Sequence, residues 1–131
     1  MANGFPQMTN ILRLSDIEGG PTSGDILCSI EDIEVGGAKE FSYRSGIEIH
    51  DIFIQRQEGQ VFAYVNVCPH AGMPLNMEQG QFMEKSGRYL MCHTHGALFQ
   101  LEDGLCVAGP CNGARLQSVS IRLEAGKIIV D

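Results

Sequence analysis

The sequence predicts an all-β domain of short antiparallel strands arranged in small packed sheets. From Ile26 onward the chain consists of short runs rich in isoleucine, valine, phenylalanine and tyrosine, which favour strands. Glycine-containing pairs separate neighbouring runs at hairpin distance. The helical signal is weak: one turn between Ser29 and Val35, which Ser29 or Asp32 could cap. These three observations predict sheets rather than helices as the source of the core.

Nine runs have the composition of strands and are bounded by glycine, aspartate or asparagine. In chain order the predicted strands are Ile26–Ile30, Lys39–Tyr43, Glu48–Gln55, Val61–Val67, Arg88–Met91, Leu98–Leu101, Leu105–Val107, Leu116–Arg122 and Lys127–Val130. The pairs predicted to turn the chain are Glu58-Gly59, Ser86-Gly87, Asp103-Gly104 and Ala125-Gly126. Because turns this short join adjacent antiparallel strands, we expect the runs on either side of each turn to pair.

Residues 1–24 are predicted to form an N-terminal arm in front of a domain that spans residues 25–131. Glycine and proline are frequent in the arm and surround one short apolar piece, Ile11–Leu14. We therefore expect the arm to lie on the surface or to be partly disordered. A chain of 131 residues suits one domain with a modest core.

The composition argues against several classes of partner. Lysine and arginine total 9 against 16 aspartate and glutamate residues, and the formal charge of -7 disfavours nucleic acid and anionic membranes. The sequence has neither an apolar run of membrane-spanning length nor the start of a signal peptide, so we expect a soluble cytoplasmic protein. Five cysteines are an odd number, which fits a reducing compartment better than a disulfide framework.

Two predicted loops carry the residues that point to chemistry. Cys68-Pro69-His70 follows one strand, and Cys92-His93-Thr94-His95 joins two later strands. Two thiolates and two imidazoles can hold a pair of irons bridged by sulfide, with both sulfurs on one iron and both histidines on the other. Gly72 and Gly96 follow the two histidines, where a positive φ or close approach to inorganic sulfide favours glycine.

The order Cys-x-His followed by Cys-x-x-His-Gly, in a β-rich domain of this size, resembles the Rieske 2Fe-2S domain. The resemblance runs from about Ile26 to Asp131. It implies an antiparallel β-sandwich of small packed sheets with a cluster-binding subdomain of two loops, at about residues 66–112. It also implies that a loop containing Gly109-Pro110 covers the cluster.

By the same resemblance, one 2Fe-2S cluster per chain would be held by four residues. Cys68 and Cys92 would ligate the inner iron, and His70 and His95 the outer iron. The 21 residues between His70 and Cys92 exceed the usual spacing of the family. We expect an extra hairpin, Gln79–Gly87, in this gap.

The resemblance also implies a low reduction potential. Respiratory members of high potential have a serine two residues after the second histidine and a tyrosine two further on, where this chain has Ala97 and Phe99. They also join their loops with a disulfide, whose cysteines would fall at Met73 and Thr94. The chain therefore resembles the soluble ferredoxins of oxygenases, and we expect a potential near or below zero in a family range of roughly -150 to +300 mV.

The implied function is that of a one-electron carrier, as a component of a multicomponent dioxygenase or other oxidoreductase rather than a catalyst by itself. We expect a flavin-type reductase as donor, a terminal oxygenase as acceptor, and a monomer or weak oligomer. One alternative is a Rieske-like small subunit of a larger reductase such as nitrite reductase. Another is a structural zinc module, although a Cys-x-His pair is uncommon in such modules.

The remaining cysteines and histidines have ordinary interpretations. Cys28 and Cys106 are predicted to pack as small apolar residues. Cys111, beside the covering loop, is interpreted as a buried inert thiol, with a redox-sensitive thiol or one next to the ligands as the alternative. His93 is predicted to be a solvated loop residue, and His50 an ordinary surface or hydrogen-bonded residue.

Overall fold

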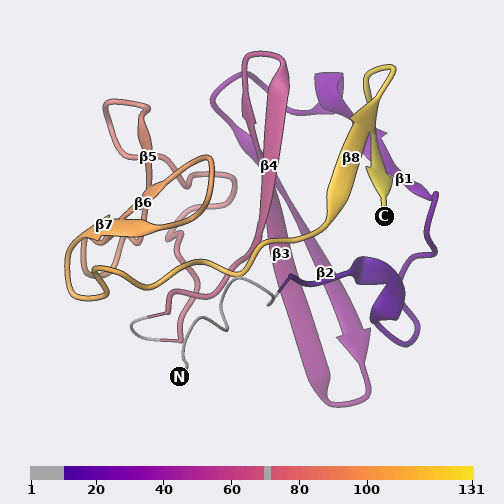
Figure 1. The fold of residues 1–131 in the computed structure, drawn as a ribbon, viewed down its shortest axis with the longest axis horizontal. Coiled ribbons are helices and arrows are strands. Elements are labelled where there is room, and N and C mark those ends of the chain that lie inside the picture. Colours follow the sequence, from indigo (N-terminus) through magenta and orange to yellow (C-terminus); the bar gives the residue numbers. More distant parts are fainter. Residues whose placement is uncertain (1–10, 70–71) are drawn as a thin grey trace.

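The computed structural model describes residues 11–69 and 72–131. Within these residues the chain forms nine strands, two short 3-10 turns and no α-helix, which confirms the predicted all-β class. The strands form three antiparallel sheets of three strands each, in the orders β1-β9-β8, β2-β3-β4 and β5-β6-β7. Figure 1 shows the β2-β3-β4 sheet between the other two. In the part of the chain that is described, no helix has the length and apolar character needed to span a bilayer.

The elements occupy most of the predicted runs. The strands are β1 Ile26–Ser29, β2 Ala38–Ser45, β3 Glu48–Gln57, β4 Gln60–Val65, β5 Tyr89–Met91, β6 Leu98–Gln100, β7 Cys106–Ala108, β8 Ile121–Glu124 and β9 Lys127–Val130. The 3-10 turns are η3 Leu14–Asp16 and η4 Ile30–Asp32. The second of these turns confirms the helical signal near Ser29, whose N–H donates to the Asp32 carboxylate at 2.9 Å.

The predicted strand Leu116–Arg122 is wrong over most of its length, because β8 overlaps only the end of this run. The residues before β8 pass between sheets and pair with two partners in turn. Ser118 forms an antiparallel bridge with Tyr64, and Val119 forms a parallel bridge with Leu12. A segment that changes partners at each step has the composition of a strand but does not belong to a single ladder.

The extra hairpin between the two ligand loops exists but lies further along the chain than Gln79–Gly87. Residues 82–84 pair with β5 around the predicted turn Ser86-Gly87. Residues 79–81 are held elsewhere, since the Gly80 N–H donates to the Glu40 carboxylate on β2 at 2.8 Å. The prediction of an extra hairpin is therefore correct, but its first strand begins near residue 82 rather than at Gln79.

Strand β3 is the centre of the fold because both of its faces are buried. Successive side chains of a strand point to opposite faces. Ile52 and Ile54 face a core shared with β1 and β9, whereas Phe53 faces a second core shared with the β5-β6-β7 sheet. In the second core Phe53 stacks on Phe82, with ring centroids 3.9 Å apart. The β5-β6-β7 sheet and the loops carrying Cys68 and Cys92 are called the loop subdomain below, about residues 66–112.

Residues 11–24, which we expected to lie on the surface or to be partly disordered, contribute to the first core. The side chains of Leu14 and Ile17 are buried there. Leu12 is tied to the adjoining backbone, since its N–H donates to the Ser118 carbonyl oxygen at 2.8 Å. Leu14 and Ile17 thus pack this segment against the first core. Two apolar residues alone are too short a pattern to distinguish such a segment from a surface loop in the sequence.

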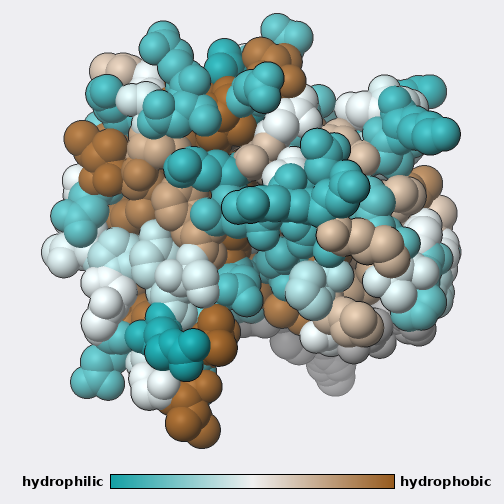
Figure 2. Space-filling view, turned by 180° about the vertical axis from the view of Figure 1, so that it is seen from behind, coloured by the Kyte–Doolittle hydropathy of each residue, from teal (hydrophilic) through white to brown (hydrophobic). Residues whose placement is uncertain are grey.

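The β2-β3 hairpin projects beyond the rest of the molecule. Figure 2 shows apolar atoms at its projecting end, next to a mostly polar face. Ile47, in the turn between the two strands, is 98% exposed. Ile49, on β3, is also exposed. A few exposed apolar side chains are common on protein surfaces, so this feature does not by itself indicate a binding site.

Candidate metal centre

The first ligand loop leaves β4 and is closed by two backbone hydrogen bonds. The Cys68 N–H donates to the Met73 carbonyl oxygen at 2.7 Å, and the Gly72 N–H donates to the Cys68 carbonyl oxygen at 2.8 Å. Gly72 has a φ of 69°, the left-handed region that favours glycine. His70 and Ala71 lie outside the described residues.

The second ligand loop, between β5 and β6, closes in the same way. The Cys92 N–H donates to the Ala97 carbonyl oxygen at 2.9 Å, and the Gly96 N–H donates to the Cys92 carbonyl oxygen at 2.7 Å. Gly96 has a φ of 75°. In both loops the glycine therefore lies four residues after the cysteine. The positive φ of Gly72 and Gly96 confirms the prediction that the backbone conformation favours glycine at these positions.

The loops turn their cysteines inward. Cys68 and Cys92 are fully buried and belong to the same hydrophobic core, whereas His95 is exposed. A thiolate in such a core is unfavourable without a compensating positive charge, which a bound metal supplies. Sulfur donors inside and an imidazole donor outside fit a cluster whose two irons differ in ligands and in exposure.

A structural zinc ion would place a different demand on these donors. In such a site all donors surround one ion, so Cys68, Cys92 and His95 would have to converge. Among residues 11–69 and 72–131, no three histidine, cysteine, aspartate or glutamate side chains are placed to hold one metal ion. A cluster of two irons divides its ligands into two pairs, one pair for each iron, so its donors do not all have to surround one ion.

The loop that contains Gly109-Pro110 lies directly against the second ligand loop. A side chain carbon added at Gly109 would be 2.8 Å from Ala97 Cα, closer than such atoms can approach. Gly109 also has a φ of 97°. Both the backbone conformation and the absence of a side chain at Gly109 are therefore needed for this contact.

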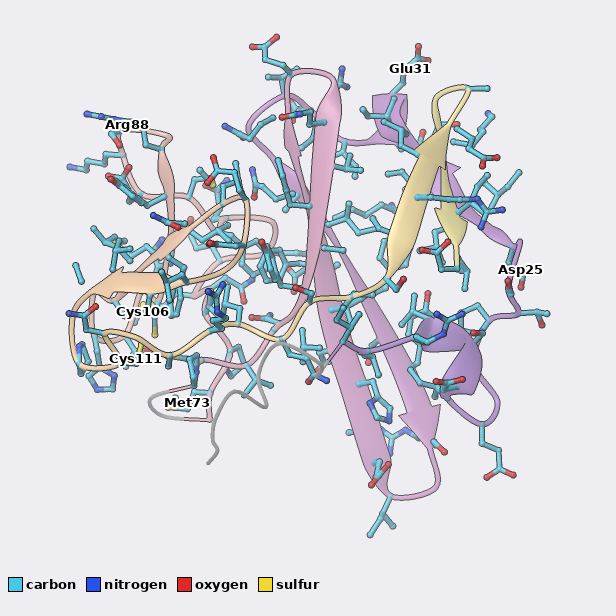
Figure 3. All side chains as sticks on the ribbon, viewed as in Figure 1. Asp25, Glu31, Met73, Arg88, Cys106 and Cys111 are labelled. Atoms are coloured by element: carbon cyan, nitrogen blue, oxygen red, sulfur yellow. The ribbon has the colours of Figure 1, made fainter. Side chains whose placement is uncertain are left out.

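Cys111, two residues after Gly109, is buried in the same hydrophobic core as Cys68. Its Sγ donates a hydrogen bond of 3.1 Å to Cys106 Sγ. Burial, and then the neighbouring thiols of Cys106 and Cys68, raise the pKa of Cys111 to about 12. Figure 3 labels Cys106 and Cys111, close to each other in the loop subdomain. Both thiols are buried as predicted.

A polar network anchors the chain that follows the first ligand loop. The buried Asn66 side chain accepts a hydrogen bond from the Leu75 N–H at 2.8 Å and donates to Asn76 Oδ1 at 3.0 Å. Asn76 in turn donates to the Glu40 carboxylate, which also binds the Gly80 N–H. This support is not signalled in the sequence, because an asparagine before a loop is common for many reasons.

His93 is not the solvated loop residue that the sequence predicts. It is half-buried, its N–H donates to the Leu75 carbonyl oxygen at 2.8 Å, and its ring Nδ1 lies 3.3 Å from the same oxygen. His93 thus ties the second ligand loop to the end of the first. His50 lies on β3, 3.6 Å from the Glu48 carboxylate, as an ordinary surface pair.

The positions associated with high potential have no hydroxyl group. Ala97 and Phe99 are both fully buried in the core of the loop subdomain. Met73 and Thr94, at the positions where the high-potential respiratory members would have their disulfide, are both exposed. The sulfurs of the site therefore receive neither the serine nor the tyrosine hydrogen bond of the high-potential proteins.

Comparisons with known proteins agree with this arrangement. The family model of the Rieske [2Fe-2S] domain matches residues 25–122. The ferredoxin component of the alkene monooxygenase system of Xanthobacter autotrophicus is 27% identical over 104 residues, which cover 79% of this chain and 77% of that protein.

Solved structures share the fold. The ferredoxin of carbazole 1,9a-dioxygenase from Nocardioides aromaticivorans is 17% identical with a TM-score of 0.62, covering 83% of this chain and 97% of that one. The Sphingomonas yanoikuyae B1 ferredoxin is 20% identical with a TM-score of 0.60, covering 82% and 97%. A complex of reduced oxygenase and oxidised ferredoxin in carbazole 1,9a-dioxygenase contains a chain with 21% identity and a TM-score of 0.63, covering 81% and 90%.

Proposed function

The chain belongs to the Rieske 2Fe-2S domain family, and we propose that it is a one-electron carrier that passes electrons to a terminal oxygenase. The observation that carries this proposal is the pair of matching loops, which bury Cys68 and Cys92 and expose His95. An exposed ligand beside buried ones gives electrons a short path to the surface while the core excludes water from the sulfurs. When bound, the cluster supplies one-electron redox chemistry.

We assign the cluster ligands as Cys68 and Cys92 for the inner iron and His70 and His95 for the outer iron. The protein's part is to hold the two thiolates, which lose their protons on binding metal, and to orient the imidazoles. Matching hydrogen bonds in the two loops fix the cysteine backbones. We leave His93 out of the ligand set because the motif Cys-x-x-His-Gly places the second imidazole at His95.

We propose a terminal oxygenase as acceptor and a flavin-type reductase as donor, with the carrier acting as a monomer or weak oligomer in the cytoplasm. The support is the likeness to ferredoxin components of an alkene monooxygenase and of carbazole 1,9a-dioxygenase. Met73 and Val107, 48% and 36% exposed, are apolar residues on or near the ligand loops. A small apolar patch suits a contact that forms and dissociates rapidly.

Anaerobically purified protein tests the cluster assignment. We expect about two irons and two sulfides per chain, a paramagnetic reduced state, and a midpoint potential near or below zero. His70→Cys and His95→Cys should each lower the potential by adding a thiolate charge, whereas Thr94→Cys, the control, should not. A colourless protein with one zinc per chain, or a potential well above about +150 mV, contradicts the proposal.

The acceptor is tested by rapid mixing of the reduced protein with the oxygenase component of carbazole 1,9a-dioxygenase, and separately with ferricyanide. Met73→Glu should slow electron transfer to the oxygenase and leave the reaction with ferricyanide unchanged. Ile26→Glu is the control, because Ile26 is 59% exposed on β1, in the sheet on the other side of β2-β3-β4 (Figure 1). Equal slowing by both variants would place the contact away from the ligand loops.

A further inference from the structure

We propose that the carrier docks its acceptor through an uncharged apolar surface at the ends of the ligand loops, and that charge contributes little to this contact. The occupant is the terminal oxygenase of the proposed function, on which this inference rests. The chemistry assigned to the oxygenase is an uncharged apolar surface beside its own redox centre. The formal charge of -7 would by itself suggest the opposite, a basic partner attracted to an acidic carrier.

The first step is the distribution of charge along the sequence. The ligand loops and the loop that contains Gly109-Pro110 belong to residues 66–77, 89–101 and 104–114, and none of these segments contains aspartate, glutamate, lysine or arginine. All 9 basic and 16 acidic residues of the chain lie outside them. The exposed residues of these three segments are called the uncharged face below.

The second step is that the topology sends the neighbouring charges to the other end of the loop subdomain. In the β5-β6 pair Met91 is opposite Leu98 beside the second ligand loop, whereas Tyr89 is opposite Gln100 at the far end. The turns at the far end carry Glu84, Lys85, Arg88, Glu102 and Asp103. Figure 3 shows Arg88 at one end of the loop subdomain and Met73 and Cys111 at the other.

The third step concerns distance and pairing. Strands of three residues separate the two ends by about 10 Å before either loop is counted. This distance is similar to the Debye length of about 8 Å at physiological salt, so the far charges are screened at the uncharged face. Arg115, which follows the third segment, bridges to Leu105 and lies 3.5 Å from the Asp103 carboxylate.

The fourth step is what the uncharged face offers instead of charge. Val67, Met73 and Val107 are 44%, 48% and 36% exposed. Other exposed residues of the three segments are Pro69, Pro74, Thr94, His95, Pro110 and Asn112. A charged residue of the acceptor at this contact would lose its water without gaining an opposite charge, which is costly. The uncharged face therefore favours an acceptor surface that is apolar as well.

The consequence is a weak dependence on salt. Rapid mixing of the reduced protein with the oxygenase component of carbazole 1,9a-dioxygenase, at about 0.05 to about 0.5 M salt, measures it. We expect the second-order rate constant to change by less than about threefold, whereas charge steering would lower it by about tenfold or more. A fall of the second size would overturn the inference.

Two inorganic oxidants of opposite charge, hexaammineruthenium(III) and ferricyanide, report the charge near the cluster without a protein partner. Over the same salt range neither rate constant should change by more than about threefold. If the oxidants meet the net charge of the chain instead, salt should slow the cation and speed the anion, each by about tenfold or more. That result would also overturn the inference.

Met73→Lys and Met73→Glu distinguish apolar docking from attraction between charges. Both should slow transfer to the oxygenase by about threefold to tenfold, because a charge of either sign must lose water at an apolar contact. A variant faster than the natural protein would overturn the inference. Lys85→Glu, at the far end of the sheet, and Glu78→Gln, directly after the first segment, are controls and should stay within about twofold. A larger change in either control would reveal a steering charge and count against the inference.

If the Met73 variants do not load a cluster, Asn112→Lys and Asn112→Glu carry the same expectation, because Asn112 is exposed in the loop that contains Gly109-Pro110. Absence of transfer from the natural protein to this oxygenase at every salt concentration counts against the proposed acceptor, and the two inorganic oxidants then decide the inference. Iron and sulfide analysis identifies the other failure of the proposed function, a natural protein without a cluster.

Discussion

The hydroxyl of Tyr64 donates a hydrogen bond of 2.7 Å to the carbonyl oxygen of Leu101. Tyr64 lies on β4 and Leu101 follows β6, so this bond joins the central sheet to the loop subdomain. Gly104 lies against the ring, because a side chain carbon there would be 2.9 Å from Tyr64 Cε1. The position of the ligand loops relative to β3 and β4 therefore depends on a buried polar contact as well as on apolar packing.

Tyr64→Phe should destabilise the protein by about 1–3 kcal/mol, because it leaves the Leu101 carbonyl oxygen without its donor in a buried position. Urea denaturation measures the loss. Tyr89→Phe, at a partly exposed tyrosine, is the control and should change the free energy of unfolding by less than about 0.5 kcal/mol. A Tyr64→Phe variant as stable as the control would show that this bond does not hold the subdomain.

Tyr64 also predicts a loss of stability in alkaline solution. Burial, and then the carboxylates of Asp103 and Glu102, raise the pKa of Tyr64 above its ordinary value. Below about pH 10 both folded and unfolded chains keep the proton and the contribution is complete. Above that pH the unfolded tyrosine ionises while the buried one does not, so stability falls as pH rises. Denaturation between about pH 8 and 11 should show a steeper loss in the natural protein than in Tyr64→Phe.

Gly109→Ala should reduce cluster loading, because the added carbon overlaps Ala97 Cα and the backbone has positive φ. Gly113→Ala is a matched control: its φ is 96°, and nothing lies within 4 Å of an added carbon. It should show only the cost of the backbone conformation, about 1 kcal/mol. Iron content and thermal unfolding measure the two effects. Similar losses in both variants would mean that the contact with Ala97 is unimportant.

Asn66→Ala should destabilise the first ligand loop, since the Leu75 N–H would lose its buried acceptor and Asn76 its donor. We expect a cost of about 1–3 kcal/mol and faster loss of iron on exposure to a chelator. Asn112→Ala, at an exposed asparagine, is the control. Equal rates of iron loss in the two variants would argue against a role for this network.

His93→Gln should keep the cluster and its spectrum, while making the second ligand loop less stable, because only the ring contact with the Leu75 carbonyl oxygen is altered. His95→Gln should lose the spectrum of the cluster, because the proposed ligand is removed. Visible absorption and EPR spectra of both variants provide the comparison. Loss of the cluster spectrum in His93→Gln, with retention in His95→Gln, would reverse the ligand assignment.

Local patterns in the sequence were sufficient for most of the fold. Runs such as Lys127–Val130 and turns such as Ala125-Gly126 have short-range causes, so they could be predicted without the tertiary structure. The strand Leu116–Arg122 was wrong because an extended segment can pair with different neighbours along its length. Leu14 was missed as a core residue because its burial depends on elements more than 100 positions away in the chain, at β9.

The sequence by itself determined the all-β class, the two cysteine and histidine loops and the glycines that close them, because each depends on residues a few positions apart. Only the tertiary structure decided which side chains meet across those loops. The burial of Cys68 and Cys111 in one core, the bond of His93 to Leu75 and the support from Asn66 all join separate segments. Such contacts arise from the way that the sheets pack on β3, and no local pattern encodes them.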